Sequence, residues 1–261
     1  MNVAAAPFRW REYAIEAVLL AIFMMSAVAF TALLEYPASP IRQVLSNATL
    51  RRSLMGVAMG LTAAAIIYSP WGRSSGAHIN PSITLTYLRL RKITARDATF
   101  YVAAQFVGAL AGLTAATEML PGIAGSRQVN YVATVPGSSG IAAAFIAEAA
   151  ISFGMASTIL TVSNTRSLSR FTGVLAACLV ALYISVESPI SGMSMNPARS
   201  FAPAIAAGSL GTWWLYVVAP LAGMLAAAEL FVRRHGHGAV LCAKLNHGTD
   251  GPCHFHCLSK Q

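Results

Sequence analysis

Two asparagine–proline pairs are the residues whose type and spacing suggest a polar site most directly. Each pair precedes a short apolar segment, at residues 81–90 and 197–207. Because an asparagine side chain can cap free N–H groups and proline needs no N–H partner at the first helical position, each pair predicts a helix start. A helix of about 10 residues is about 15 Å long, which is half the thickness of a hydrocarbon layer. The residues of the two starts are Asn80, Pro81 and Ser82, and Asn196, Pro197 and Ala198.

The chemistry available at such helix starts is polar but not acidic. The free N–H groups and positive dipole ends of two short helices would together repel cations. The amide groups of Asn80 and Asn196 add N–H donors that a neutral molecule such as water can accept. A water oxygen held by both amides turns its neighbours outward in opposite directions, which interrupts a chain of proton-transferring waters. This chemistry requires the two helices to meet, so other elements must position them.

Six long apolar runs supply those elements. Apolar residues make up 56% of the 261 residues and charged residues only 10%, against about 25% charged residues in soluble domains. Several runs reach about 20 residues, which is enough to cross a bilayer. We therefore expect an all-α membrane protein with six transmembrane helices and two re-entrant half-helices. The runs cover Tyr13–Leu34, Leu54–Tyr68, Ala98–Ala116, Ile141–Val162, Phe171–Val186 and Trp213–Val232.

The order of these runs repeats itself in the two halves of the chain. Tyr101 follows Asn80 by 21 residues, and Tyr216 follows Asn196 by 20. With three spans per copy, the second copy must be inverted, so the short helices enter from opposite faces and meet near the midplane. The expected parts are an N-terminal segment at 1–12, a first repeat at 13–120, a connecting loop at 121–140, a second repeat at 141–234 and a tail at 235–261.

Positive charge predicts the orientation in the membrane. The net charge is +9, and Lys and Arg are scattered among the apolar runs, which argues against binding to nucleic acid. Thirteen of these residues fall on the side of the two chain ends and five on the other side. Because cytoplasmic loops carry an excess of Lys and Arg, both termini are predicted to be cytoplasmic, with the protein in the inner (cell) membrane.

The segments Ser75–Ser82 and Ser191–Phe201 resemble the two signatures of the major intrinsic protein family, the aquaporins and aquaglyceroporins, in its bacterial type. The resemblance covers residues 10–234. It implies a passive channel in each protomer of a homotetramer in the lipid bilayer, with no enzymatic activity and no cofactor. It also implies a selectivity filter near the outer mouth, formed by Met59, Ile184, Met193 and Arg199.

The details of the resemblance leave the transported molecule open. Water-selective members of the family place Phe and His where this chain has Met59 and Ile184, so an apolar and wider filter is expected, suited to glycerol-like solutes or metalloid hydroxides. The first signature reads Asn-Pro-Ser rather than Asn-Pro-Ala, and the serine side chain is nearly as small as that of alanine. In contrast, Ser200 and Ala204 resemble the water-channel pattern. Water and small uncharged solutes are both expected to pass, with ions and protons excluded.

Two other functions remain open. Inverted repeats with broken helices also occur in proton-coupled secondary transporters, although those normally carry a coupling carboxylate beside the broken helices. Glu16 and Glu148 open the two repeats at matching positions. A repeated structural role, accepting N–H groups of the half-helix loops, is favoured over a proton relay. A junction protein with a narrowed pore is the third possibility.

The remaining polar candidates are His78 and the tail. With no second ligand near it in the sequence, His78 is interpreted as a buried, hydrogen-bonded residue rather than a metal ligand. No metal site is predicted, and Cys242, Cys253 and Cys257 are kept only as candidates, because their spacing matches no standard zinc pattern. Since the cytoplasm is reducing, a disulfide among them is not expected.

Overall fold

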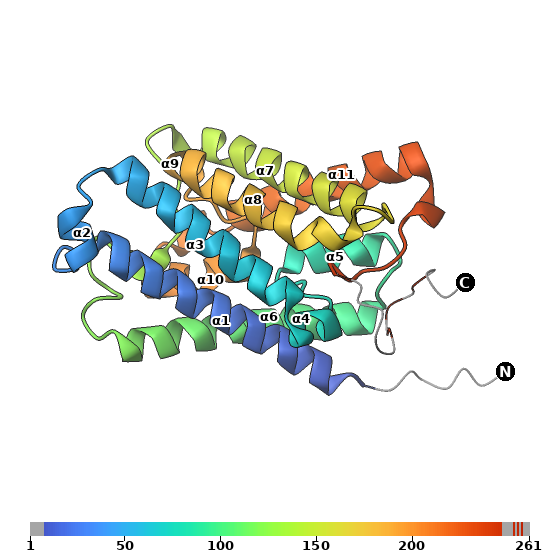
Figure 1. The fold of residues 1–261 in the computed structure, drawn as a ribbon, viewed down its shortest axis with the longest axis horizontal. Helices are drawn as coiled ribbons and strands as arrows, with labels where there is room; N and C mark the ends of the chain where they lie inside the picture. The colour runs from blue at the N-terminus through green and yellow to red at the C-terminus, as the bar shows by residue number, and fades with distance from the viewer. Residues whose placement is uncertain (1–7, 247–252, 254, 256, 258–261) are drawn as a thin grey trace.

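The computed structural model describes residues 8–246, 253, 255 and 257, and in this part of the chain the regular secondary structure is helical. Six helical segments are long and apolar enough to cross a membrane, and they form an elongated bundle (Figure 1). The predicted all-α membrane fold is therefore confirmed. The long helices are α1 Trp10–Glu35, α3 Ala48–Tyr68, α6 Ala95–Met119, α7 Gly140–Ser163, α8 Thr172–Val186 and α11 Leu215–His235.

Shorter helices connect or interrupt the long ones. Those that follow the asparagine–proline pairs are α5 Pro81–Arg89 and α10 Pro197–Ala206, which end one residue before the predicted limits. The other short helices fall in the segments that connect the apolar runs, where a proline in the first turn begins a helix without losing a hydrogen bond. They are α2 Pro40–Val44, α4 Pro70–Ser75 and α9 Ser188–Ser191, with 3-10 turns η1 Asn130–Val132, η2 Ser169–Phe171, η3 Leu210–Thr212 and η4 His237–Ala239.

Helix α3 begins earlier than its apolar run at Leu54 suggests. The Asn47 side chain caps the helix by accepting a hydrogen bond from the Leu50 amide at 3.0 Å. Arg51 lies in the first turn but is buried, where it forms an ion pair with Glu35 at 3.0 Å. Because the ion pair satisfies the arginine, the helix extends through residues whose hydropathy alone would end the span.

The helices pack in pairs that follow the internal repeat. Helix α1 packs along α6, α7 packs along α11 in the same way, and α3 of the first repeat packs along α8 of the second. Gly108 lies against the backbone of Ala17, and Gly223 lies against that of Ala149, so that a methyl group at either glycine would overlap a carbonyl oxygen. Such small residues allow helices to approach closely where lipid gives no hydrophobic driving force.

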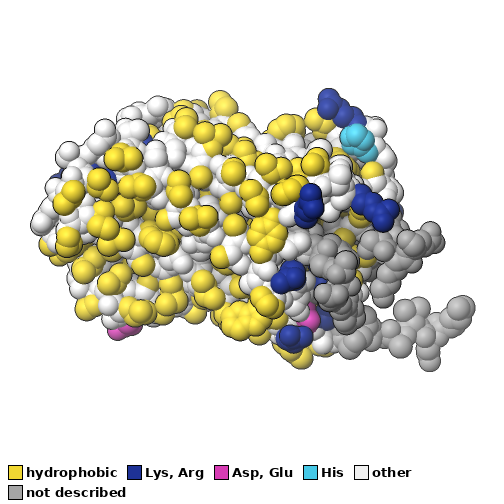
Figure 2. Space-filling view, viewed as in Figure 1, with side chains coloured by type: hydrophobic (Ala, Val, Ile, Leu, Met, Phe, Trp, Pro, Cys, Tyr) yellow, Lys and Arg dark blue, Asp and Glu magenta, His cyan; other side chains and the backbone are white. Residues whose placement is uncertain are grey.

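The outer surface matches a membrane environment. Figure 2 shows apolar side chains spread over most of the visible face, whereas Lys and Arg gather mainly at the end where the two chain termini lie. The exposed apolar side chains include Val57 and Leu61 of α3, and Val174 and Leu182 of α8. A soluble protein rarely exposes so large an apolar surface, so this surface is lipid-facing.

Candidate functional site: the meeting point of the two half-helices

Helices α5 and α10 begin at the two asparagines. Asn80 Oδ1 accepts a hydrogen bond from the Ser82 amide at 2.8 Å. Asn196 Oδ1 accepts from the amides of Ala198 at 3.1 Å and Arg199 at 3.2 Å. Each side-chain oxygen therefore caps its own helix, which leaves the side-chain NH2 group to donate elsewhere.

The NH2 groups tie the two half-helices together. Asn80 Nδ2 donates to the Met195 carbonyl at 2.7 Å, and Asn196 Nδ2 donates to the Ile79 carbonyl at 2.8 Å. The two residues of the first bond are 115 positions apart in the sequence, and those of the second are 117 positions apart. Since an amide nitrogen carries two hydrogens, each asparagine keeps one N–H donor beyond this bond. Both asparagines line the central cavity described below.

Buried glutamates hold the loops that lead into both half-helices. Glu148 accepts hydrogen bonds from the Ser191 hydroxyl and the Ser194 amide, both at 2.7 Å, and from the Met195 amide at 2.8 Å. Glu16 makes the matching contacts in the first repeat, with the Ser75 hydroxyl at 2.7 Å, the His78 amide at 3.1 Å and the Ile79 amide at 2.6 Å. Both glutamates are completely buried.

These contacts stabilise an unusual backbone. Ala77 and Ile79 before α5, and Met193 and Met195 before α10, adopt positive φ angles between 40° and 56°. Non-glycine residues in this region cost roughly 1–3 kcal/mol each and persist where the surrounding structure fixes them. The glutamates of α1 and α7 bind amides of these loops, and the Ser75 and Ser191 hydroxyls accept from the Ala77 and Met193 amides within them, so both sets of contacts hold the strained conformation.

The two glutamate networks are not identical. Gln105 Nε2 donates to Glu16 Oε2 at 2.8 Å and to Thr84 Oγ1 at 3.1 Å. The matching position in the second repeat is Pro220, which has no donor. Gln105 was not among the predicted site residues, although its place in the repeat, at the position that Pro220 occupies in the second copy, was the available signal.

A cavity of about 500 Å³ runs past the half-helices. Its lining includes Leu34 and Asn130 toward one end, Asn80 and Asn196 in the middle, and Leu245 of the tail toward the other end. The other motif residues support the half-helices rather than line the cavity, and Pro81, Ser82, Pro197 and Ala198 are buried in the described part of the chain. An uncharged polar constriction between two positive helix ends can hold water while repelling cations.

All four residues proposed for the filter line this cavity. Met59 comes from α3, Ile184 from α8, Met193 from the loop before α10, and Arg199 from the first turn of α10. The Arg199 nitrogen Nη1 is buried without a hydrogen-bond partner among the described residues. It is therefore a free donor beside the path, with two methionines and an isoleucine contributing apolar surface.

Glu187 is a buried acid just beyond the end of α8, outside the span. Only 6% of its surface is exposed. Burial raises the pKa of Glu187 to about 7, with the nearby charge of Glu148 acting in the same direction and the Ser191 hydroxyl in the opposite one. Its neighbour Ser188 lines the cavity, so a group that changes charge near neutral pH lies close to one end of the path.

The tail folds back under the first half-helix, which the sequence analysis did not predict. The His78 ring contacts the Ala243 carbonyl through Nε2 at 2.8 Å and Thr84 Oγ1 through Nδ1 at 3.1 Å. Its face stacks on Phe255 with ring centroids 5.4 Å apart. His78 thus lies buried between α5 and the tail, and the sequence contains no periodic signal for such a long-range contact.

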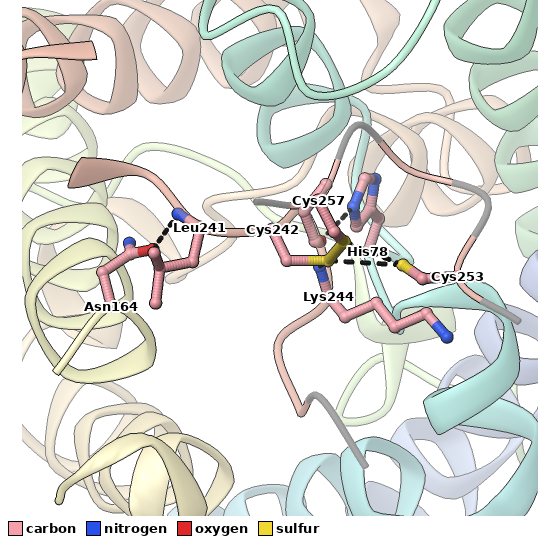
Figure 3. The surroundings of a disulfide bond; sticks show 8 residues. His78, Asn164, Leu241, Cys242, Lys244, Cys253 and Cys257 are labelled. Atoms are coloured by element: carbon pink, nitrogen blue, oxygen red, sulfur yellow. Dashed lines mark hydrogen bonds between the residues drawn. A yellow bond between two sulfur atoms is a disulfide. The ribbon is translucent and has the colours of Figure 1, made fainter. Parts of the chain in front are cut away.

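The three tail cysteines lie together (Figure 3). Cys242 and Cys257 form a disulfide, so the expectation of no disulfide is wrong for this structure, because the folded-back tail brings together thiols 15 residues apart. Cys253 Sγ lies 2.8 Å from Cys257 Sγ and 3.5 Å from Cys242 Sγ. Three further tail histidines, His247, His254 and His256, lie outside the described residues.

Comparisons with known proteins agree with this architecture. The chain is 33% identical over 175 residues to aquaporin NIP1-1 of Oryza sativa subsp. japonica, covering 67% of this chain and 60% of the relative. It is 36% identical over 173 residues to aquaporin NIP3-1 of Zea mays, covering 66% of this chain and 56% of the relative. The matching region thus spans a little over half the length of these plant relatives.

A bacterial relative and a solved structure extend the comparison. Glycerol uptake facilitator protein-like 6 of Lactiplantibacillus plantarum is 35% identical over 177 residues, with 67% of this chain and 81% of the relative covered. The X-ray structure of the aquaglyceroporin from Plasmodium falciparum superposes with a TM-score of 0.72 at 17% identity, covering 85% of this chain and 95% of that one, and so shows the same fold. The family model described as "Major intrinsic protein" matches residues 4–231. With two opposed half-helices on either side of a central cavity, this chain belongs to the major intrinsic protein family.

Proposed function

We propose that this protein is a passive transmembrane channel for water and small uncharged solutes that excludes ions and protons. The observation that carries the proposal is the cavity of about 500 Å³ that passes both Asn80 and Asn196. Their amides donate at its centre, and the positive ends of α5 and α10 face it from both sides. Diffusion down a gradient through such a path needs no catalytic chemistry.

The filter residues favour solutes larger than water. Met59, Ile184 and Met193 present aliphatic side chains, and Arg199 presents a single buried cation with a free donor. An apolar wall suits the carbon side of a polyol, and the arginine suits its hydroxyl groups. The name of one relative, glycerol uptake facilitator protein-like 6, agrees with glycerol-like solutes.

The buried glutamates argue against a proton-coupled transporter. Glu16 and Glu148 each accept at least three hydrogen bonds from the half-helix loops. Neither is among the described residues that line the cavity. A coupling carboxylate must exchange protons with both sides, which a fully bonded group behind the wall does not do.

We further propose a homotetramer with one pore per protomer, in the inner (cell) membrane, with both termini cytoplasmic. Support for the orientation comes from the basic end of the bundle, at which both termini lie. Support for assembly comes from membership of the family, together with the exposed apolar helix faces. The two repeats, the connecting loop and the tail keep the proposed limits of 13–120, 121–140, 141–234 and 235–261.

Stopped-flow light scattering on proteoliposomes tests the proposal. Vesicles with the protein should shrink faster than empty vesicles in an impermeant osmolyte, and should reswell in glycerol, with neither rate altered by a pH gradient. Shrinkage at the rate of empty vesicles would reject the channel and favour the junction protein. Solute uptake that follows an imposed proton gradient would favour the transporter.

A further inference from the structure

The three tail thiols are arranged for more than a disulfide. The sulfur atoms of Cys242, Cys253 and Cys257 all lie within 4.8 Å of one another. A disulfide uses two of them and gives no role to Cys253, which nevertheless contacts both of the others. When all three are reduced, three thiols converge on one point, which is the ligand set that soft and borderline metal ions prefer.

The surroundings of the thiols resemble the shell that supports a metal site. Cys242 is only 5% exposed and packs in an apolar cluster with Val240 and Phe255, which limits access of water. The Lys244 amide donates to Cys242 Sγ at 3.5 Å (Figure 3). A hydrogen bond to sulfur favours the thiolate, and such outer contacts tune metal affinity.

We propose that the reduced tail binds one zinc-class metal ion through the thiolates of Cys242, Cys253 and Cys257, with water in the fourth position. Reduction of the Cys242–Cys257 disulfide takes two electrons from two small thiol molecules, which become a disulfide. The ion then replaces three thiol protons, which pass to solvent, with no change in oxidation state. Zn²⁺ is the first candidate because it accepts tetrahedral sites with three protein ligands.

The site fixes the tail at one end of the cavity. Three hydrogen bonds anchor the segment that carries Cys242. The Leu241 amide donates to Asn164 Oδ1 at 2.6 Å, and the Leu245 amide donates to the Gly76 carbonyl at 3.1 Å. The Ala243 carbonyl accepts from His78 Nε2 at 2.8 Å. Leu245 itself lines the cavity. An ion that joins Cys242 to Cys253 and Cys257 therefore holds Leu245 in the path, and zinc should lower the permeability. This coupling rests on the proposed channel function.

Metal binding is measured without any transport assay. Untagged, full-length protein in detergent is reduced with a phosphine and titrated with Zn²⁺ against a chromophoric chelator, and with Co²⁺ to observe thiolate-to-metal charge transfer. We expect one ion per protomer and a charge-transfer band. Cys253→Ser should weaken binding by at least about 10-fold, since loss of a ligand costs no less than loss of an outer contact.

The control variant is Cys178→Ser, which changes the exposed thiol of α8 outside the cluster. It should bind like the unmodified protein. Because Cys253 is outside the disulfide, its replacement removes a metal ligand and leaves the disulfide cysteines in place. Absence of zinc binding would overturn the proposal. Equally strong binding by Cys253→Ser would also overturn it, and would assign the affinity to other tail residues such as the histidines.

The coupling to the pore is measured on the same preparations in proteoliposomes. Reduced protein loaded with Zn²⁺ should show at least a twofold lower water permeability than protein treated with a chelator, and Cys253→Ser should show no difference. Stoichiometric binding without any effect on permeability would overturn the coupling. Permeability equal to that of empty vesicles in both states would instead reject the channel function, while the binding result would stand.

Discussion

At the scale of single residues, the proposed selectivity depends on one arginine and a largely aliphatic wall. Arg199 lies in the first turn of α10, where its amide donates to Asn196 Oδ1, and its side chain lines the cavity that the two asparagines also line. A charged side chain at this depth is costly and is normally functional. Its charge repels cations, and its free N–H groups replace hydrogen bonds that an entering molecule loses to water.

Replacing the cation is expected to relax the exclusion of ions. Arg199→Val removes the charge while keeping a small side chain, so proton and cation leak should rise, by roughly tenfold if the charge supplies about 1.4 kcal/mol of the barrier. A pH-sensitive dye trapped in proteoliposomes measures the proton leak. Arg166→Val, at an exposed site outside the spans, is the control. An unchanged leak in Arg199→Val would show that the filter lies elsewhere.

The width of the filter is expected to determine passage of polyols. Met59→Phe places a rigid ring where a flexible thioether lines the cavity, so glycerol uptake should fall by roughly tenfold or more while water flux falls much less. Reswelling in glycerol and shrinkage in an impermeant osmolyte measure the two rates. Leu61→Phe, on the lipid-facing side of the same helix, should change neither. Equal losses of both rates would indicate general blockage.

Glu187 is expected to make stability depend on pH. The pKa of Glu187 is raised from its ordinary value of 4.5 to about 7, so the folded protein binds this proton more tightly than the unfolded chain. Stability therefore decreases as pH rises from about 4.5 to about 7, and the full penalty remains above that window. Glu187→Gln should raise the Tm more at pH 8 than at pH 5. The same increase at both values, or an identical response from exposed Glu118→Gln, would contradict the assignment.

At the scale of elements, the half-helices depend on the long helices that hold their loops. Glu148 of α7 contacts the loop before α10 through three hydrogen bonds, and Glu16 of α1 does the same for α5. The reciprocal bonds of Asn80 and Asn196 to the Met195 and Ile79 carbonyls also hold these positive-φ loops. Two carboxylates that do not line the cavity thus help to hold in place the loops that do.

Removing one of these carboxylates should destabilise the protein. Glu148→Ala leaves three buried donors without their acceptor, at a cost of at least about 3 kcal/mol. A clear fall in the Tm of the detergent-solubilised protein, with reduced water flux per folded protomer, is the expected result. Glu118→Ala, on the exposed end of α6, serves as control. If the unmodified protein responded to a proton gradient and Glu148→Ala kept its Tm but lost that response, a relay role would replace the structural one.

Much of this element arrangement could be predicted from sequence. The apolar runs indicated six spans because lipid-facing helices must be apolar along their length, and the asparagine–proline pairs indicated both half-helix starts. The start of α3 was missed because the ion pair of Arg51 with Glu35 hides a charge that hydropathy counts as exposed. The disulfide and the packing of His78 on the tail were also missed, since they depend on contacts between residues far apart in the sequence.

At the scale of the whole molecule, the inverted repeat explains why one path crosses the bundle. Helix α5 contacts α11 and helix α10 contacts α6, so each half-helix packs against the opposite repeat. The reciprocal bonds of Asn80 and Asn196 then close the junction. One end of this symmetric core differs from the other, because it carries the basic residues, both termini and the tail with Leu245. Regulation by the tail is proposed at this end.

Thiol modification inside the cavity tests most directly whether this path conducts. Val180 of α8 lines the cavity, whereas Leu182 on the same helix is 53% exposed on the outer surface. Val180→Cys and Leu182→Cys are made in a Cys178→Ser background, reconstituted, and treated with a methanethiosulfonate reagent. Water permeability of Val180→Cys should fall nearly to that of empty vesicles and return after reduction, while Leu182→Cys and the background stay unchanged. Full modification of Val180→Cys, verified by mass, with undiminished water flux would show that water does not cross between the two half-helices.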